Sequence, residues 1–216
     1  MLSDLVRAWT LGWTVSRETP PPVEEPLSLR IDVGRPRQVV RHVVLDPTEA
    51  TVRKLTEAVT EPATWLKSAV APDLIAPWLP DGWVEDAPGF LMSIDLRAEP
   101  VVLADGYTMT HEARDGVTRL QIRAADGSPA AHGQVAVPHE AAVAVVDRVE
   151  TDPAHQRRGL GSVIMKTLAA TALDAGATSA VLGATIEGRA LYEALGWTVR
   201  APLAGFIYRP TTGTIS

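Results

Sequence analysis

The longest amphipathic pattern in the chain begins at Leu160 and predicts an α-helix. Apolar residues recur there at the spacing of one helix face; they are Leu160, Val163, Ile164, Leu168 and Ala172. Gly176 follows the last of them, and glycine commonly ends a helix because it adopts the left-handed conformation without a steric penalty. The helix is therefore expected to open directly behind residues 156–162, "QRRGLGS".

The pattern before this helix is that of strands. Residues 106–138 contain three strand-like runs separated by the turn signals "RDG" and "ADG", which predicts an antiparallel meander. Residues 141–151, "AAVAVVDRVET", are apolar on both faces and predict a central strand. After the helix we expect a strand "SAVLGA", a short helix "GRALYEALG" and a final pair of strands around "WTVRAP" and "GFIYRP".

The first half of the chain is interrupted repeatedly by proline. Strands are predicted at "LSLRIDV", "RQVVRHVVL" and "GFLMSIDL", and a helix over residues 48–60, capped by Asp46 with Pro47 in its first turn. The tryptophan-rich residues 64–83 predict short helices joined by proline turns. We expect an α+β chain with two parts, an N-terminal lobe over residues 1–99 and a second domain over residues 100–216.

Composition and charge exclude several kinds of protein. With 46% hydrophobic and 21% charged residues, the chain is typical of a globular protein. Its net charge of −6 and scattered basic residues argue against a nucleic-acid partner and favour an amine-bearing substrate. The absence of cysteine excludes disulfides, thiolate-bound zinc and a cysteine nucleophile.

Localisation and metal binding can be addressed from the same sequence. The N-terminal segment carries Asp4 and Arg7 within its apolar stretch, so it is not typical of a signal peptide. No apolar run approaches the ~18 residues of a membrane span. We expect a cytoplasmic protein with no membrane partner, and leave open whether it forms a homodimer. No metal site is expected, because histidines 42, 111, 132 and 139 lack ligand spacing.

The segment "QRRGLGS" favours an anionic ligand. The start of a helix leaves backbone N–H groups unpaired and carries partial positive charge. Gly159 and Gly161 let a ligand approach the backbone, and Arg157 and Arg158 add charge. A dinucleotide fingerprint needs a further glycine where Ile164 stands, and a nucleotide P-loop needs a Gly-Lys-Ser/Thr ending, which is absent. A loop that holds the diphosphate of coenzyme A remains.

These residues resemble the GNAT acetyltransferase superfamily. The family motif Gln/Arg-x-x-Gly-x-Gly/Ala is matched by "QRRGLG", with "VETDP" upstream and "ALYEALGW" downstream in family-like order and separation. The resemblance covers roughly residues 100–210. It implies a GNAT fold, with a mixed, mostly antiparallel sheet flanked by helices. The first half is similar to segments of some bacterial members that carry a degenerate second GNAT-like lobe.

The resemblance implies acetyl-CoA as co-substrate and transfer to an amine by direct attack in a ternary complex. Tyr192 aligns with the tyrosine that protonates the departing thiolate, and Asp147 with a catalytic glutamate of the central strand. The positions implied to bind the cofactor are Val149, Glu150, Thr151, Gln156, Arg157, Arg158, Gly159, Leu160, Gly161, Ser162 and Thr185. Thr185 stands where many relatives carry asparagine.

The base that removes the amine proton stays open between three alternatives. Asp147 is shorter than the usual glutamate and would act through a water. Glu150 is the next acidic residue, and strand alternation places it on the opposite face from Asp147, so that only one faces the acetyl group. Either carboxylate could instead form a structural ion pair, and the proton could pass to solvent.

The expected function is N-acetylation of a small or amino-acid-like amine. The alternatives are a non-catalytic, CoA-binding GNAT-fold regulatory or interaction module and an enzyme that acylates a hydroxyl or transfers a longer acyl chain.

Overall fold

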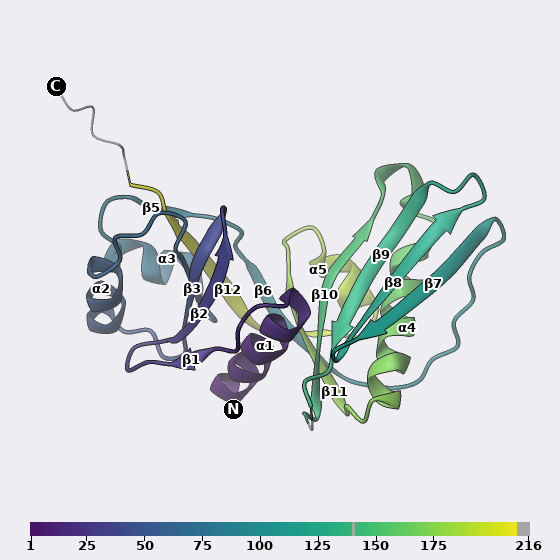
Figure 1. Cartoon of the computed structure of the whole chain (residues 1–216), viewed down its shortest axis with the longest axis horizontal. Helices are drawn as coiled ribbons and strands as arrows, with labels where there is room; N and C mark the ends of the chain where they lie inside the picture. Colours follow the sequence, from purple (N-terminus) through teal and green to yellow (C-terminus); the bar gives the residue numbers. More distant parts are fainter. Residues whose placement is uncertain (140, 211–216) are drawn as a thin grey trace.

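The computed structural model describes residues 1–139 and 141–210. Within them the strands form a 12-stranded sheet in the order β1-β2-β3-β4-β12-β6-β11-β10-β9-β8-β7, with β5 paired to β12 (Figure 1). Two neighbouring pairs are parallel, β3 with β4 and β10 with β11. The remaining pairs are antiparallel. The prediction of an α+β fold with a mixed, mostly antiparallel sheet is therefore confirmed.

The second half follows the sequence pattern closely. The meander is formed by β7 (Tyr107–Arg114), β8 (Val117–Ala124) and β9 (Pro129–Ala136), and leads to the central strand β10 (Val143–Thr151). The amphipathic pattern becomes α4 (Leu160–Asp174), which packs on β8, β9 and β10. Next come β11 (Ser179–Ala184) and the short helix α5 (Arg189–Ala194).

The last strand of the described residues is one long strand where a pair was predicted. This strand is β12 (Thr198–Tyr208), and it crosses the middle of the molecule (Figure 1). Its register to β6 (Gly89–Asp95) shifts between Val199 and Ala201, and the strand continues through Pro202. It pairs with β6 at one end and with β4 (Trp65–Ser68) at the other. The two halves of the chain thus share this strand.

The first half contains a smaller α+β unit. Its strands are β1 (Val23–Glu24), β2 (Leu29–Arg35), β3 (Gln38–Val44), β4 and β5 (Trp83–Glu85), and its helices are α2 (Glu49–Glu57), α3 (Pro72–Ile75) and η1 (Ala76–Trp78). Two details correct the sequence prediction. Thr48 caps α2 by accepting a hydrogen bond from the Thr51 N–H at 3.2 Å, in place of Asp46. Residues 65–68 extend as a strand where helix was expected, because they pair with β3 and β12.

The helix α1 (Leu2–Arg17) was not predicted and lies where the two halves meet (Figure 1). It packs on β9, β10 and β11, on the face of the sheet opposite to α4. Its buried residues Val6, Trp9 and Trp13 form a hydrophobic cluster with β2 and β3 of the first half and with β6, β10 and β12. This cluster joins the two halves through a shared core.

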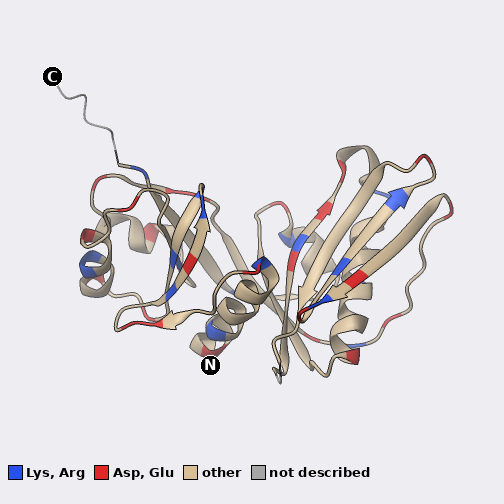
Figure 2. Cartoon of the chain, viewed as in Figure 1, with Lys and Arg blue, Asp and Glu red and all other residues tan. Residues whose placement is uncertain are grey.

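The division at residues 99 and 100 stays a prediction. Strand β6 lies before that boundary and pairs with β11 beyond it, and β12 lies after it and pairs with β4. Basic and acidic residues are interspersed over both halves (Figure 2). Among the residues described, no helix is long and apolar enough to cross a membrane.

Candidate active site

The two parallel strands of the second half diverge and leave an open edge. Residues 143–145 of β10 pair with residues 179–181 of β11, and the pairing stops there although both strands continue. From Val146 onward, β10 keeps only its other neighbour, β9. Among the described residues no strand pairs with this edge of β10 from Val146 onward, so the edge is open to a ligand.

A β-bulge interrupts β10 inside the proposed site. Arg148 adopts a left-handed conformation with φ 54°, and the register to β9 shifts between Asp147 and Glu150. Val149 packs into the core on the α4 side, so Glu150 points to the other face, the one that Asp147 shares. The prediction that the two carboxylates lie on opposite faces is wrong, because the extra residue resets the alternation.

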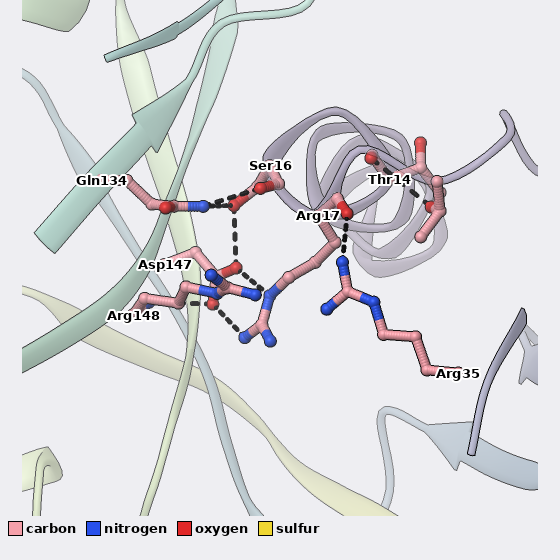
Figure 3. A network of polar contacts seen from close by, with 8 residues as sticks. Thr14, Ser16, Arg17, Arg35, Gln134, Asp147 and Arg148 are labelled. Atoms are coloured by element: carbon pink, nitrogen blue, oxygen red, sulfur yellow. Dashed lines mark hydrogen bonds and ion pairs between the residues drawn. The ribbon is translucent and has the colours of Figure 1, made fainter. Parts of the chain in front are cut away.

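Asp147 is held by the end of α1 (Figure 3). Its Oδ1 accepts from Nη2 of Arg17 at 2.8 Å and from the Arg148 backbone N–H at 2.9 Å, and its Oδ2 accepts from Arg17 Nε and from Oγ of Ser16 at 2.8 Å. Burial acts to raise the pKa of Asp147, but the hydrogen bonds and charge of Arg17 outweigh it and hold the pKa below its ordinary value. A carboxylate held in this way is a weak proton acceptor.

Glu150 has a different environment. Its side chain is 72% exposed, and its ion pair is with Nε2 of His132 at 3.8 Å, across the strand pair β9–β10. No arginine binds this carboxylate among the residues that the structure describes. Of the two carboxylates, Glu150 is therefore the one that no described arginine binds.

The loop before α4 forms an open cradle. It follows the short helix η2 (Pro153–His155), and Arg157 and Gly159 both adopt left-handed backbone, with φ 60° and 77°. A Cβ atom built on Gly159 would meet no atom within 4 Å. The first α4 residue whose N–H bonds back into the loop is Val163, which donates to the Gly159 carbonyl at 3.1 Å. The preceding N–H groups of the first turn point from the helix end toward the loop.

Two polar side chains of the loop, Gln156 and Arg158, bond within the protein, whereas Arg157 bonds to none of the described residues. Gln156 Nε2 donates to the Thr151 carbonyl at 3.4 Å and ties the loop to β10. Arg158 Nη1 donates to the Tyr107 hydroxyl at 3.0 Å, and that hydroxyl also lies 3.1 Å from Nδ1 of His155. Arg157 is exposed and pairs with no group in the described part of the chain. It is the cation of the loop that is free to meet an anion.

The remaining predicted positions of the loop, residues 160–162, are buried or half-buried. The side chain of Leu160 is buried in the core under α4, and Ser162 is half-buried in the first helical turn. Gly161 lies close to α5, since a Cβ there would be 3.0 Å from Leu191 Cδ2. Tyr107 was missed by sequence analysis, because a residue 51 positions away carries no local signal for this contact.

Tyr192 lies in α5 beside the turn that follows β11. A Cβ atom on Gly188 would be 3.2 Å from both Thr185 Oγ1 and Tyr192 Cε2, which places the ring edge next to that turn. Thr185 Oγ1 accepts from the Gly188 N–H at 3.0 Å, so its hydroxyl oxygen braces the turn. The Tyr192 hydroxyl bonds to no described residue. Burial, and next the charge of Asp147, raise the pKa of Tyr192, so the phenol stays protonated.

A cavity of about 400 Å³ lies between the two halves and is called here the interlobe cavity. It is bordered by residues 145–147 of β10 and by residues 183–187, which form the end of β11 and the turn after it. Trp9, Trp13 and Arg17 of α1 also line it. Arg41 of β3 and Lys67 of β4 line it from the first half. These two cations could not be identified from the sequence, because they lie far upstream of the loop motif and of Tyr192.

The chain belongs to the acetyltransferase (GNAT) family, whose sequence profile matches residues 88–197. It is therefore an N-acetyltransferase family member, of a family that uses acyl-CoA. The matched region begins at β6 and ends after α5, so it contains the diverging strands, the loop and Tyr192. No curated protein matches the chain at a significant level.

Solved structures show the same fold at low sequence identity. A GCN5-related N-acetyltransferase from Kribbella flavida has a TM-score of 0.66 and 17% identity, over 96% of this chain and 95% of that one. A GNAT-family protein from Novosphingobium aromaticivorans has a TM-score of 0.61 and 19% identity, over 95% and 99%. A tandem GNAT protein from the clavulanic acid biosynthesis pathway has a TM-score of 0.54 and 11% identity, over 96% and 94%. The similarity to all three extends through both halves.

Proposed function

We propose that the protein transfers the acetyl group of acetyl-CoA to the amine of a small molecule, by direct attack in a ternary complex. The observation that carries this proposal is the alignment of two open backbone surfaces. The unpaired edge of β10 beyond Val145 leads to the loop before α4, whose first-turn N–H groups and Arg157 have no partner among the described residues. A long, thin ligand with an anionic diphosphate fits such a surface.

The residues present fit coenzyme A. The N–H groups of residues 156–162 and the guanidinium of Arg157 would hold the diphosphate, and the open space over Gly159 admits it without a clash. The backbone of residues 149–151 would bind the pantetheine arm along the free edge of β10. Acetyl-CoA supplies the acetyl group as a thioester. The protein positions this thioester and protonates the departing sulfur.

The chain's own residues move two protons during transfer. The amine nitrogen attacks the thioester carbonyl carbon, so that a C–N bond forms, the C–S bond breaks and the sulfur leaves as thiolate. Tyr192 is the general acid that protonates this sulfur, because its hydroxyl is protonated and bonds to none of the described residues. Glu150 is the favoured acceptor of the amine proton, directly or through water, since Asp147 is bound to Arg17.

Calorimetric titration with acetyl-CoA, free CoA and NADH tests the cofactor. We expect micromolar binding of acetyl-CoA and CoA and none of NADH. A panel of primary amines then tests the transfer, with release of the CoA thiol as the signal. Binding without thiol release from any amine would contradict catalysis of N-acetylation and favour a regulatory, CoA-binding module. No binding of acetyl-CoA would overturn the cofactor assignment itself.

A further inference from the structure

The interlobe cavity contains a buried arginine that has no carboxylate partner among residues 1–139 and 141–210. Arg41 is 8% exposed, and its guanidinium lies over the Trp13 ring, 3.7 Å from the ring centroid. With the Gln38 amide oriented so that its oxygen faces Arg41, this oxygen accepts from Nε at 2.7 Å and from Nη2 at 2.9 Å. One edge of the guanidinium is thus occupied. The edge formed by Nη1 and Nη2 remains for a ligand.

A buried lysine lines the same cavity. Lys67 is 5% exposed, and its Nζ donates to the Ala87 carbonyl at 2.7 Å, which uses one of three N–H groups. Room for this ammonium is made by Gly205 on the neighbouring strand, where a Cβ atom would lie 2.1 Å from Nζ. The position of Lys67 therefore depends on a glycine in β12. The side chain of Lys67 can therefore extend over Gly205 of the neighbouring strand.

Burial and neighbouring positive charge disfavour both cations. Burial and then the charge of Arg17 lower the pKa of Arg41 to about 9, against the attraction of Asp147. Burial and then the charge of Arg41 lower the pKa of Lys67 to about 7, against Asp86. Buried charges normally carry partners, because their desolvation costs several kcal/mol.

The carboxylates near the cavity do not neutralise this pair of cations. Asp147 is bound to Arg17, and Asp86 forms an ion pair with Arg209 at 2.8 Å. Glu187 lies exposed at the rim of the cavity. In the described part of the chain, neither Arg41 nor Lys67 forms an ion pair with a carboxylate. An anion from outside the chain would supply the missing partner.

We infer that the interlobe cavity is the acceptor pocket, and that Arg41 and Lys67 bind a carboxylate of the acceptor. The substrates are then small primary amines that carry a carboxylate, as α-amino and β-amino acids do. This inference rests on the proposed function and names its substrate class. A planar carboxylate suits the free guanidinium edge of Arg41, which offers two parallel N–H groups.

The position of the cavity connects this anchor to the chemistry. The same cavity borders β10 and β11 where they diverge, and it lies on the α1 side of the sheet, opposite to α4. An acceptor anchored on Arg41 can therefore present its amine at the opening between the strands. The volume of about 400 Å³ falls within the range of small-molecule sites.

Matched pairs of amines test the anchor. We would offer glycine and glycinamide, β-alanine and β-alaninamide, and O-phosphoethanolamine and ethanolamine, with acetyl-CoA and a thiol-release assay. The amide of each amino acid has the less basic amine, so chemistry alone favours the amide, and a preference for the acid reports recognition. We expect kcat/KM to be at least about tenfold higher for the acid. Equal use of acid and amide, or preferential use of the phosphate, would overturn the carboxylate assignment.

Variants test the residues. In Arg41→Gln and Lys67→Met, we expect the preference for acid over amide to fall at least about tenfold, with the KM for acetyl-CoA unchanged. If Arg41→Gln does not fold, the preference measured in Lys67→Met decides the test. The control Arg53→Gln removes one positive charge from the exposed face of α2, outside the cavity, and should leave the preference unchanged. An unchanged preference in folded Lys67→Met and Arg41→Gln would overturn the inference.

A binding experiment separates this inference from the proposed function. If no amine is acetylated, calorimetry with N-acetylglycine and N-acetylglycinamide, in the presence of CoA, tests the cavity alone. Binding of the acid that is at least about tenfold tighter than that of the amide, and lost in Lys67→Met, would support the carboxylate site although catalysis had failed. Failure of the acid to bind more tightly than the amide would overturn the site.

Discussion

Arg17, the last residue of α1, binds both carboxylate oxygens of Asp147 in the middle of β10, across 130 positions of sequence. The side chains are 28% and 14% exposed, so the pair is only partly screened by water. Because Ser16 also donates to Asp147, the end of α1 is fixed to the strand that borders the proposed acetyl site. The contact positions α1 as one wall of the interlobe cavity.

Removing either partner should destabilise the protein to a similar extent. We expect Asp147→Asn and Arg17→Gln each to lower the free energy of unfolding by about 1–3 kcal/mol, because a partly buried charge loses its hydrogen-bond partner. Urea unfolding at pH 7 measures the change. A loss below about 0.5 kcal/mol in both variants would show that the contact contributes nothing to stability.

The same two variants decide whether Asp147 takes a proton during transfer. If it only positions α1, both should lower kcat by the same modest factor, within about threefold of each other, whereas Glu150→Gln should lower kcat by about 10²-fold or more. The three variants are compared by thiol release under saturating substrates. A large loss in Asp147→Asn, with Arg17→Gln and Glu150→Gln near wild type, would identify Asp147 as the base instead.

Tyr192→Phe should separate catalysis from stability. The hydroxyl bonds to no described residue, so its removal should change the free energy of unfolding by less than about 0.5 kcal/mol. We expect kcat to fall by about 10²-fold, because the thiolate then leaves without a general acid. Tyr208→Phe is the matched control, since Tyr208 packs on Trp83 in the first half. Equal kcat values for the two variants would remove Tyr192 from the mechanism.

The second half of the fold could be predicted because its signals are local. Turn residues, alternation and the helical spacing after Gly159 lie within single elements, and the loop motif lies at the point where strand becomes helix. The helix α1 was not predicted, because it is buried on several sides and so lacks a clear polar face. Its polar residues Thr10 and Thr14 are in the core, where each hydroxyl donates to a backbone carbonyl of the preceding turn.

The geometry of the site depends on features without a local signature. The bulge rests on the left-handed conformation of Arg148, a non-glycine residue that the sequence does not mark, and it reverses the face of Glu150. The cations Arg41 and Lys67 reach the cavity through the pairing of β3 with β4 and of β4 with β12. A net charge of −6 favoured a cationic acceptor, whereas the local charge at the cavity favours an anionic group beside the amine.

Gly161→Glu tests the cradle of the cofactor. We expect at least a 10²-fold loss of affinity for acetyl-CoA, because a carboxylate would be placed beside the diphosphate at the start of α4. Gly161→Ala is the control, since its Cβ would approach Leu191 Cδ2 at 3.0 Å, the end of a flexible side chain, without adding charge. Calorimetry measures both, after thermal unfolding has shown that they fold. Unchanged affinity in folded Gly161→Glu would refute the assignment of the loop.

The histidine His42 should make stability depend on pH. It is 7% exposed and its Nδ1 lies 2.9 Å from the Ser28 hydroxyl. Burial, and then the charge of Arg30, lower its pKa to about 4, against Asp32, so the folded state favours the neutral ring. The unfolded chain binds a proton near pH 6.5, and the folded one only near pH 4. The contribution of this neutral ring to the free energy of unfolding is therefore fully present above pH 6.5. It is lost as the pH drops from 6.5 to 4.

The size of this effect is measured by comparing the pH dependence of stability in wild type and in His42→Gln. Between pH 7.5 and 4, wild type should lose about 3 kcal/mol more than His42→Gln, in which the titrating group is gone. Urea unfolding across the range gives the two curves, and other carboxylates and histidines cancel when the curves are subtracted. His111→Gln, which removes an exposed ring from β7, should run parallel to wild type. Parallel curves for His42→Gln would mean that this histidine is charged in the folded protein.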